Sequence, residues 1–573
     1  FPNNSPANAE LWGADDAVPP IVGRMAAATT FTAVTLTDAL ATGAGSSMRG
    51  ASYGGKLFLA YDSAVDRAHV YDPTLASPRV RRVGLAVPGA APTVANTGAG
   101  SYAATIRYYR QRYRIKNGTI VVAQSEPSAS VTFTPSGSGT HARVTKAATI
   151  SESETHWVLE GSPNNTWFYE IAEIAVATTT YDDNEAPTTD YPTNDLSPVV
   201  GAYTNVTSAK YVIAAFNRLL WAGSWESGGL QSRVWYSTAK GASDKGDDER
   251  IPDTLTVRKR FFLDVGTGGV ITGFAGPLYC AVYIFKYTQI RKAIPTGADY
   301  PVFEVIDLSL TRGAIDQESI ALGENAQHEP GIYFLDPQVG PMFTGPVVPT
   351  EIGHGVSDQW DLVNLAATTK VGWVLDYPDK GQVWFAWALS AGNEPTILAI
   401  YTKETGGWSV FDTGGKIRLS RAAVLFARTL GVSMSRDKVP YVGYSSVANT
   451  LLRCDTTDLD DTTTTFQALV KTKPFALNGG QPFRGTTPWI LAKAASGVTL
   501  TVTADLDFGR ETRSGTVLLT ADASESYVFR PVEGLDVNGA RFLQLEIGDA
   551  AAIANSWQID GIFLPVMPES IGP

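Results

Sequence analysis

The sequence predicts an all-β protein, in which a β-propeller carries an inserted immunoglobulin- or fibronectin-III-like sandwich and is followed by a C-terminal β-sandwich. The first supporting observation is the abundance of turn residues, with 54 glycines and 33 prolines in 573 residues and few long helical patterns. The second is a set of short runs rich in Trp, Tyr, Phe, Val and Ile, which are typical of buried strands. The third is repetition, since one strand–turn–strand phrase recurs at intervals of roughly 40 to 60 residues.

The clearest copy of this repeated unit occupies residues 210–294, where the apolar runs are separated by glycines and by one polar segment. Each further copy has an apolar run, a turn and a second run that ends in a polar or acidic residue. These copies lie at residues 54–72, 331–343, 380–390, 397–412 and 439–455. Such a unit is typical of a propeller blade, and pairing of early with late copies would close a ring and hide the sheet edges.

Changes in composition along the chain predict five segments. Residues 1–50 form an extended arm that gains its order by lying along another part of the assembly, or else a flexible terminus. Residues 51–90 form the first blade segment, 91–184 the inserted sandwich, 185–465 the main propeller and 466–573 the C-terminal sandwich. We expect such a division because a chain of this length is too long for one hydrophobic core.

The predicted insertion begins with a strand in which Tyr and Arg alternate, followed by a hairpin turn at Asn117-Gly118. The segment from Gly118 to Ser128 is similar to the corresponding segment of fibronectin type III domains. Within the strand, three arginines share one face, because successive side chains of a strand point to opposite sides. We expect this face either to form an interface with an acidic partner or to be solvated. The three residues are Arg110, Arg112 and Arg114.

Charge and cysteine content restrict the function. The formal net charge of −12 and the pI of about 5.1 are the opposite of the basic surface that grips nucleic acid through its phosphates. Cys280 and Cys454 sit in apolar runs, so we expect buried thiols rather than a disulfide. No apolar stretch of the sequence reaches the roughly 18 to 20 residues that a membrane span needs.

Motifs for catalysis or metal binding are absent from the sequence. The five histidines are scattered, and no HExxH, zinc, Walker A, GxGxxG or GxSxG pattern occurs, so we expect no metal and no cofactor. Propellers can host glycosidases with two facing carboxylates, and the candidate acids here are Asp264, Asp307, Asp376, Glu404 and Asp412. Each lies at a predicted strand end, where acids commonly cap turns. We therefore expect that the protein is not an enzyme.

Two further groups of residues have both a structural and a functional interpretation. The acidic run of Asp455, Asp458, Asp460 and Asp461 lacks the order of an EF-hand loop, and a solvated linker is favoured over a calcium site. A set of tryptophans could line a sugar groove, but packing between blades is favoured. These tryptophans are Trp221, Trp225, Trp235, Trp373, Trp384, Trp387 and Trp408.

Several phrases of the sequence resemble those of structural tail proteins of short-tailed bacteriophages, in the nozzle or hub class also called packaged-DNA stabilisation proteins. The phrases are NRLLWAG…SRVWYS (217–237), GVITGFAGPLYCAVYIFKYTQIRKAI (269–294), FEVIDLSLTRGAIDQESI (303–320), and GIYFLDPQVGPMF (331–343) with IGHGV (352–356). They occur in the order in which such phrases recur along the propeller of that class. The resemblance covers residues 217–461 well and the earlier part of the chain more loosely.

The resemblance implies a mechanical role in the virion. Such proteins form a ring, commonly a hexamer, that holds the packaged genome below the portal and adaptor and then conducts it during ejection, without specific DNA binding. It implies an adaptor protein and tail fibres as partners, no membrane span, and assembly in the cytoplasm of the bacterial host. An acidic channel would suit this role because DNA slides past it without sticking. The alternative is a carbohydrate-binding or depolymerising propeller at the phage or cell surface.

Overall fold

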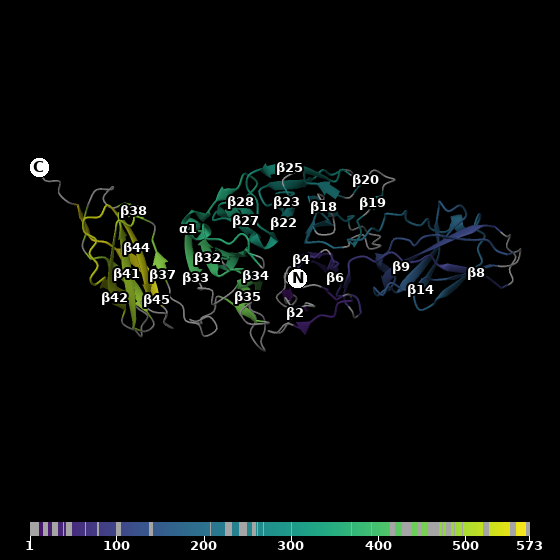
Figure 1. Ribbon diagram of the computed structural model, residues 1–573, viewed down its shortest axis with the longest axis horizontal. Helices are drawn as coiled ribbons and strands as arrows, with labels where there is room; N and C mark the ends of the chain where they lie inside the picture. The colour runs from purple at the N-terminus through teal and green to yellow at the C-terminus, as the bar shows by residue number, and fades with distance from the viewer. Residues whose placement is uncertain are drawn as a thin grey trace. The chain divides into compact units, whose positions relative to one another are not determined.

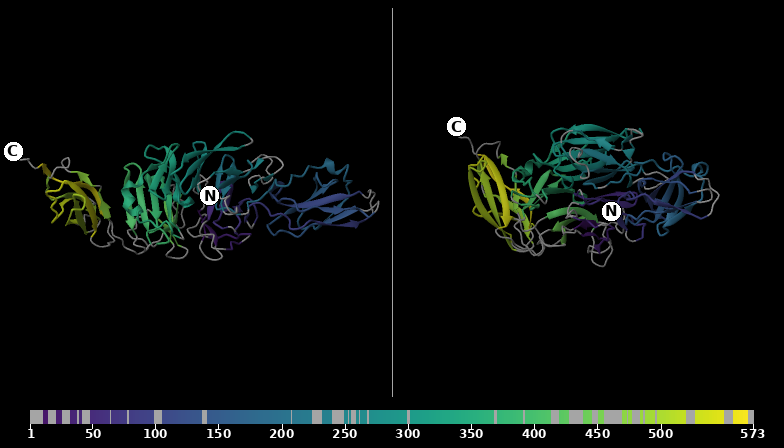
Figure 2. Two further views of the ribbon diagram at one scale, coloured as in Figure 1. Left: turned by 45° about the horizontal axis from the view of Figure 1, so that its top comes forward. Right: turned by 45° about the vertical axis from the view of Figure 1, so that its right-hand side comes forward.

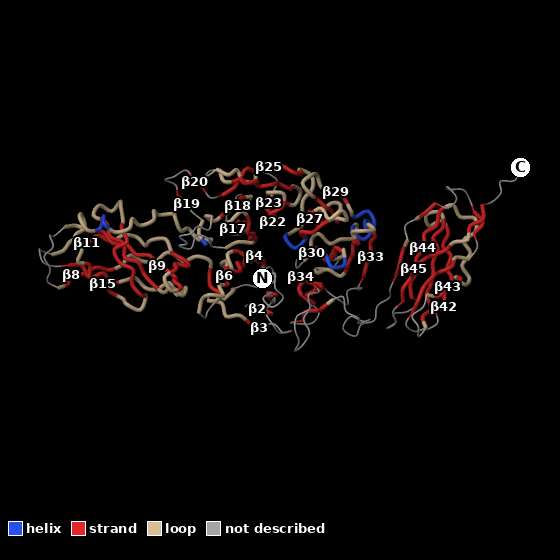
Figure 3. Tube along the Cα trace, turned by 180° about the vertical axis from the view of Figure 1, so that it is seen from behind, coloured by secondary structure: helices blue, strands red, loops and turns tan. Residues whose placement is uncertain are grey.

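The structure, a computed structural model, divides into two compact units, one made of residues 1–408 and 418–452 and the other of residues 409–417 and 453–573. Strands dominate both units (Figures 1 and 3), so the predicted all-β class is confirmed. The residues described are 11–14, 21–25, 32–37, 39–41, 48–63, 65–76, 79–98, 105–136, 141–206, 208–223, 232–239, 249–251, 253–254, 259–260, 262–266, 269–298, 301–367, 370–390, 392–412, 419–426, 438–444, 450–454, 469–472, 474–476, 483–485, 487–494, 497–519, 527–549 and 557–568.

Six antiparallel sheets, named here the first to the sixth, follow one another along the chain between residues 49 and 453. The first is β4 (Arg49–Tyr53), β5 (Lys56–Ala60), β6 (His69–Tyr71) and β7 (Val80–Arg82), and the second is β16 (Tyr211–Ala215), β17 (Arg218–Ala222), β18 (Arg233–Tyr236) and β21 (Phe262–Asp264). The third is β22 (Ile271–Leu278), β23 (Ala281–Lys286), β24 (Ile290–Pro295) and β25 (Phe303–Ser309), and the fourth is β26 (Ile320–Glu324), β27 (Pro330–Asp336), β28 (Gly340–Thr344) and β29 (Thr350–Glu351). The fifth is β30 (Gly372–Tyr377), β31 (Gln382–Trp387), β32 (Ile397–Thr402) and β33 (Gly407–Asp412), and the sixth is β34 (Leu419–Phe426), β35 (Lys438–Tyr444) and β36 (Thr450–Arg453).

In each of these sheets the strands are paired in sequence order, and the first strand of each sheet lies beside the first strand of the next, from β4 through β16, β22, β26 and β30 to β34. We call these six the inner strands. Neighbouring sheets pack face to face through their second strands, which are buried on both sides. This double burial explains why β23 reads as a continuous apolar run rather than an alternating one.

Aromatic contacts lie between neighbouring sheets from the first to the fifth. Phe58 meets Trp221 with ring centroids 6.1 Å apart, and Phe285 meets Phe334 at 5.4 Å. The tryptophans therefore serve mainly as core residues, which confirms the favoured interpretation for four that are buried: Trp221, Trp373, Trp384 and Trp387. Trp235 and Trp408 are half-buried, and Trp225 lies outside the described residues.

The prediction that both thiols are buried is wrong for Cys280, which is exposed, whereas Cys454 is half-buried. Tyr279 and Cys280 form the two-residue turn between β22 and β23, and both have positive φ, of 48° and 56°. The apolar run in the sequence therefore contains a tight turn that lacks the usual Gly or Asn signal. A turn residue projects from the end of its hairpin, which exposes the thiol.

The described residues of the N-terminal segment form a small sheet of β1 (Leu11–Ala14), β2 (Val22–Met25) and β3 (Thr32–Ala33). Its Val22, with Leu40, packs against Leu57 and Leu59 of the first sheet. The ring centroids of Trp12 and Tyr71 lie 4.9 Å apart. This segment is thus ordered by contact with the first sheet.

Between the first and second sheets the chain builds a two-sheet domain, which we call the inserted domain. One sheet pairs β9 (Arg107–Asn117) with β10 (Ile120–Gln124), β11 (Val131–Phe133) and β13 (His156–Ser162), and β14 (Tyr169–Ala175) follows at the edge. The other sheet is β8 (Thr93–Thr97), β12 (His141–Thr145) and β15 (Thr180–Asp183). Between them lies a core that includes Tyr109, Trp157 and Val144. The β9–β10 hairpin forms where the sequence predicts it, with Gly118 at φ 60°.

The first unit also contains short elements outside these sheets. They are the pair β19 (Asp253–Thr254) and β20 (Lys259–Arg260), the helix α1 (Ser357–Trp360), and the 3₁₀ turns η3 (Tyr191–Thr193), η6 (Gln317–Ser319), η7 (Gly353–Val356) and η8 (Pro378–Lys380). No helix within the described part of the chain is long and apolar enough to cross a membrane.

The second unit has a five-stranded sheet of β37 (Leu469–Lys471), β38 (Phe475–Ala476), β41 (Val498–Leu506), β42 (Glu511–Leu519) and β44 (Phe542–Asp549). A three-stranded sheet has the order β43 (Val528–Pro531), β40 (Trp489–Ala494) and β45 (Trp557–Phe563), and β39 (Phe483–Gly485) pairs with β46 (Val566–Pro568). Alternate residues of β40, β41 and β44 meet in one apolar core. Figure 2 shows the strands of each unit from two further directions.

Buried ion pairs join distant parts of the first unit. Glu249, in the segment between β18 and β21, accepts two hydrogen bonds from Arg81, at 2.5 and 2.7 Å, one from Lys56 at 3.0 Å and one from the Gly84 amide at 2.9 Å. Burial alone would raise the pKa of Glu249, but the charges of Arg81 and Lys56 outweigh it and lower the pKa to about 2. The carboxylate thus ties the second sheet's long connection to the first sheet.

We expect this node to make folding acid-sensitive. The folded pKa of Glu249 lies below its ordinary value of 4.5, so its contribution is complete above pH 4.5 and is lost as the pH falls towards 2. Glu249→Gln should destabilise the first unit by about 3–5 kcal/mol at pH 7, because two cations would lose their buried counter-charge. Thermal melts from pH 7 to pH 3 would test this, and parallel pH profiles of the wild type and the variant would contradict it.

Candidate functional site

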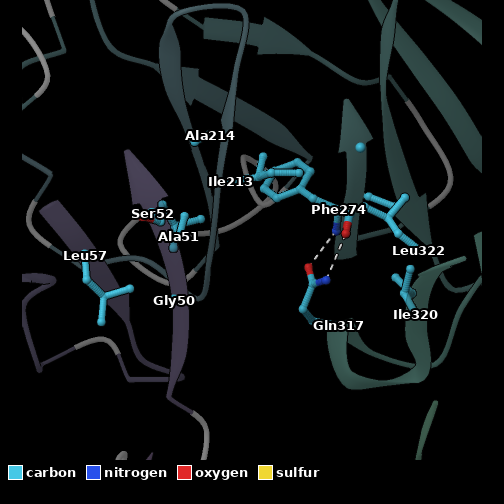
Figure 4. A pocket seen from close by; sticks show the side chains of 13 residues that line it. Gly50, Ala51, Ser52, Leu57, Ile213, Ala214, Phe274, Gln317, Ile320 and Leu322 are labelled. Carbon is cyan, nitrogen blue, oxygen red and sulfur yellow. Dashed lines mark hydrogen bonds between the residues drawn. The ribbon is translucent and has the colours of Figure 1, made fainter. Parts of the chain in front are cut away.

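The inner strands of the first four sheets surround a cavity of about 470 Å³ (Figure 4). The larger apolar side chains of its wall are Leu57, Ile213, Phe274, Ile320 and Leu322. Small residues at Gly50–Ser52 and Ala275–Gly276 complete the wall. We call this space the inner-strand cavity.

Gln317 of η6 fixes one side of this cavity. Its side-chain Oε1 accepts from the Phe274 amide at 2.7 Å, and its Nε2 donates to the Phe274 carbonyl at 2.8 Å, as the dashed lines of Figure 4 show. The amide group thereby pairs with β22 as a neighbouring strand residue would. Gly273 permits this close approach, because a Cβ atom there would lie 3.0 Å from both Cα and Oε1 of Gln317.

A group of charged residues lies next to the cavity, at the start of the inner strands. Arg49 Nη2 is 3.0 Å from Glu318 Oε2, and Lys370 Nζ is 2.7 Å from the same oxygen and 3.2 Å from Asp316 Oδ2. We call Arg49, Asp316, Glu318 and Lys370 the charged cap. The side chains of Arg49 and Lys370 are each only 8% exposed. The cap therefore connects the first sheet to the fourth and to the chain that enters the fifth.

The charged cap is held by the second sheet as well. The guanidinium carbon of Arg49 lies 5.0 Å from the ring centroid of Tyr211, and Arg49 Nη1 donates to the Lys210 carbonyl at 3.4 Å. Burial alone would lower the pKa of Arg49, but the negative groups around it, chiefly Glu318 with Tyr211 and Asp316, together outweigh burial and raise the pKa above the ordinary value. Burial raises the pKa of the Tyr211 hydroxyl. The cap is thus an ion-pair network in which each carboxylate has a cationic partner.

The carboxylates singled out from the sequence are dispersed over the sheets. Asp307 pairs with Arg291 at 3.1 Å and Asp376 with Lys403 at 2.5 Å. Burial raises the pKa of Asp376, against the opposing effect of Lys403. Glu404 lies exposed in the turn before β33, and Asp264 and Asp412 end strands β21 and β33. Among the described residues, no group of three or more His, Cys, Asp and Glu side chains is placed to hold a metal ion.

The arginines predicted as an interface lie in the inserted domain, where β9 directs them to one side of its sheet. Arg110 and Arg112 both pair with Glu160 on β13, and Arg114 pairs with Glu170 at 2.5 Å and Glu173 at 2.7 Å. They are 8%, 0% and 3% exposed. Their face is covered from within the chain, because Arg112 Nη2 donates to the Pro198 carbonyl at 2.6 Å. The solvated-face alternative is therefore wrong, while an interface with another protein stays a prediction.

Sequence reasoning missed the charged cap and Gln317. Arg49 and Glu318 are 269 positions apart, and each is a single charged residue beside a strand, so no spacing or motif identifies them. The acidic run from Asp455 to Asp461 lies outside the described residues.

Comparison with known proteins gives no match to any protein-family model and none to any curated protein. Among solved structures, the chain is similar to an exo-β-1,3-galactanase from Phanerochaete chrysosporium, with 12% identity and a TM-score of 0.21 over 64% of this chain and 98% of that one. It is also similar to the extracellular domain of a hybrid two-component system from B. thetaiotaomicron, with 11% identity and a TM-score of 0.27 over 97% and 72% of the two chains. A glycoside hydrolase family 43 arabinoxylan arabinofuranohydrolase from Bacillus subtilis gives 10% identity and a TM-score of 0.18 over 74% and 93%. Likeness this low carries no argument about function.

We predict that Arg49→Gln destabilises the first unit by about 3 kcal/mol, because a buried carboxylate loses one of its two cations. The matched control is Arg143→Gln, which removes a closer ion pair, 2.7 Å from Asp182, in which the arginine side chain is 49% exposed. That change should cost much less, because an exposed pair is solvated and screened. Urea unfolding of both variants measures the difference, and equal midpoints would show that the charged cap contributes no more than a surface pair.

Proposed function

We propose that this chain is a structural virion protein of a short-tailed bacteriophage, a subunit of the tail nozzle or hub ring that retains the packaged genome and forms the channel for its ejection. In this proposal the six sheets are blades of a β-propeller. The inserted domain is an immunoglobulin- or fibronectin-III-like module of it, and the second unit is the C-terminal β-sandwich. The protein acts in the virion after assembly in the host cytoplasm.

The observation that carries the proposal is where the phage-like phrases fall. Residues 217–237 cover β17 and β18, residues 269–294 cover β22 to β24, and residues 331–343 cover β27 and β28. These three phrases thus supply central strands of the second, third and fourth sheets, and the phrase at residues 303–320 covers β25 and η6. The resemblance extends over consecutive structural units in the same order, as expected of a shared architecture rather than of a shared catalytic motif.

The size of the inner-strand cavity bears on where DNA passes in the proposed ring. The cavity holds only about 470 Å³ and adjoins the charged cap. It is therefore too small for a B-form duplex, which is about 20 Å across. DNA therefore passes between subunits of the proposed ring and not through the centre of any one of them. The formal net charge of −12 suits such a passage, because a repelled duplex slides without binding.

The alternative is a carbohydrate-binding or depolymerising propeller. A depolymerase of the usual kind needs two facing carboxylates that are available to the substrate. Asp316 and Glu318 adjoin the cavity but are paired with Lys370 and Arg49. The nozzle role is therefore the better supported of the two.

The test is to measure the mass of the purified chain by light scattering and to image it by cryo-electron microscopy, alone and with a cognate adaptor ring. We expect a sixfold ring, either free or assembled on the adaptor, with an opening of at least about 20 Å between subunits. A monomer or trimer that ignores the adaptor and cleaves a host polysaccharide would exclude the nozzle role and support the alternative.

A further inference from the structure

Aromatic rings gather on the solvent-facing side of the sheet β43-β40-β45 in the second unit. Alternation along β40 sends its even-numbered residues into the core and leaves Trp489 and Leu491 on the opposite side. β43 adds Phe529, which is 45% exposed, and β45 adds Phe563, which is 49% exposed. We call these four residues the aromatic face.

The rings of the aromatic face form one continuous group. Trp489 and Phe529 are stacked, with centroids 4.8 Å apart and planes inclined by 18°. Phe529 and Phe563 meet edge to face at 5.1 Å and 80°. These two phenylalanines come from strands on opposite sides of β40 and therefore meet above it.

Gly561 gives Phe563 its position. A Cβ atom at residue 561 would lie only 3.0 Å from Phe563 Cε2 and 3.4 Å from Cζ, so the ring lies over the bare backbone of the glycine. A ring seated in this way has its other side open to solvent, in agreement with its exposure. The combination of an exposed ring and a glycine beneath it is a specific geometry and not a lone surface hydrophobic residue.

The size of the aromatic face indicates what can bind there. Three strands about 4.8 Å apart, the middle one six residues long, give a surface of roughly 14 by 20 Å. This area, roughly 300 Å², is well below the roughly 800 Å² per partner of a stable protein–protein interface. A single extended polymer chain fits it.

We propose that the aromatic face binds one strand of a polysaccharide by stacking of pyranose rings. The C–H groups on a pyranose face carry partial positive charge and pack against the negative face of an aromatic ring. Tyr527, 38% exposed, and Lys493, whose Nζ lies 5.3 Å from the Tyr527 centroid, flank the rings and offer hydrogen-bond donors to sugar hydroxyls. This site belongs to the second unit and does not depend on the nozzle role.

The test begins with the full-length protein on a glycan array that carries bacterial polysaccharides and pyranose oligosaccharides. Affinity electrophoresis through gels that contain the best-bound polysaccharide then gives dissociation constants. We expect Phe563→Ala and Phe529→Ala each to weaken binding about tenfold or more, the loss expected for one stacked ring. Gly561→Val should weaken it similarly by displacing Phe563 while all aromatic residues remain.

The matched control is Phe508→Ala, because Phe508 is also an exposed aromatic residue of the second unit, with 72% of its surface exposed. Its ring does not belong to the aromatic face and contacts Phe542 instead, with ring centroids 4.6 Å apart. This variant should bind as the wild type does, and circular dichroism melts should show that all variants are folded. Absence of binding to every glycan, or wild-type binding by Phe563→Ala, would overturn the proposal. So would a change in oligomeric mass on Phe563→Ala without glycan, since the face would then bind protein.

Discussion

The ion pair between Arg49 and Glu318 is the contact on which the arrangement of the first unit most depends. It joins residues 269 positions apart, from the beginning of the first sheet and the approach to the fourth. Neighbouring sheets are held by apolar packing, which is strong but non-directional and so does little to fix the orientation of one sheet on the next. A buried ion pair must satisfy geometry as well as charge. Arg49 meets both conditions by contacting Tyr211 and the Lys210 carbonyl in addition to Glu318.

The same principle recurs where other parts of the chain meet the first sheet. Glu152 of the inserted domain accepts from Arg82 at 2.7 Å, Arg67 at 3.1 Å and the Ala86 amide at 2.8 Å. Glu249 binds Arg81 and Lys56 in the same way from the second sheet's connection. The inserted domain and the connection between β18 and β21 are thus each attached to the first sheet through one carboxylate that accepts from several donors. These contacts fix the position of both segments relative to the first sheet.

The sequence allowed the strands and most of their turns to be predicted, because buried strands leave a local pattern. The β9–β10 hairpin is an example, with its Asn117-Gly118 signal. The turn at Tyr279-Cys280 has no such signal, and the thiol was placed wrongly. The pairing of Arg112 with Glu160 and of Arg49 with Glu318 could not be predicted from the sequence. A charged residue in a sequence gives no sign of the distant partner that allows its burial. The aromatic face was missed for a similar reason, since its rings come from three strands between residues 489 and 563.

The buried clusters also change how the formal charge should be understood. Glu249 is surrounded by Arg81 and Lys56, and Glu160 by Arg110 and Arg112, so each of these clusters has one more cation than anion. The charged cap, with two cations and two anions, is balanced. Other buried carboxylates offset this excess, because the described buried residues include nine Asp and Glu against eight Lys and Arg. The interior is therefore close to neutral, and nearly all of the formal net charge of −12 belongs to residues outside it. A polyanion outside the protein meets the field of this net negative charge, which the salt around it weakens.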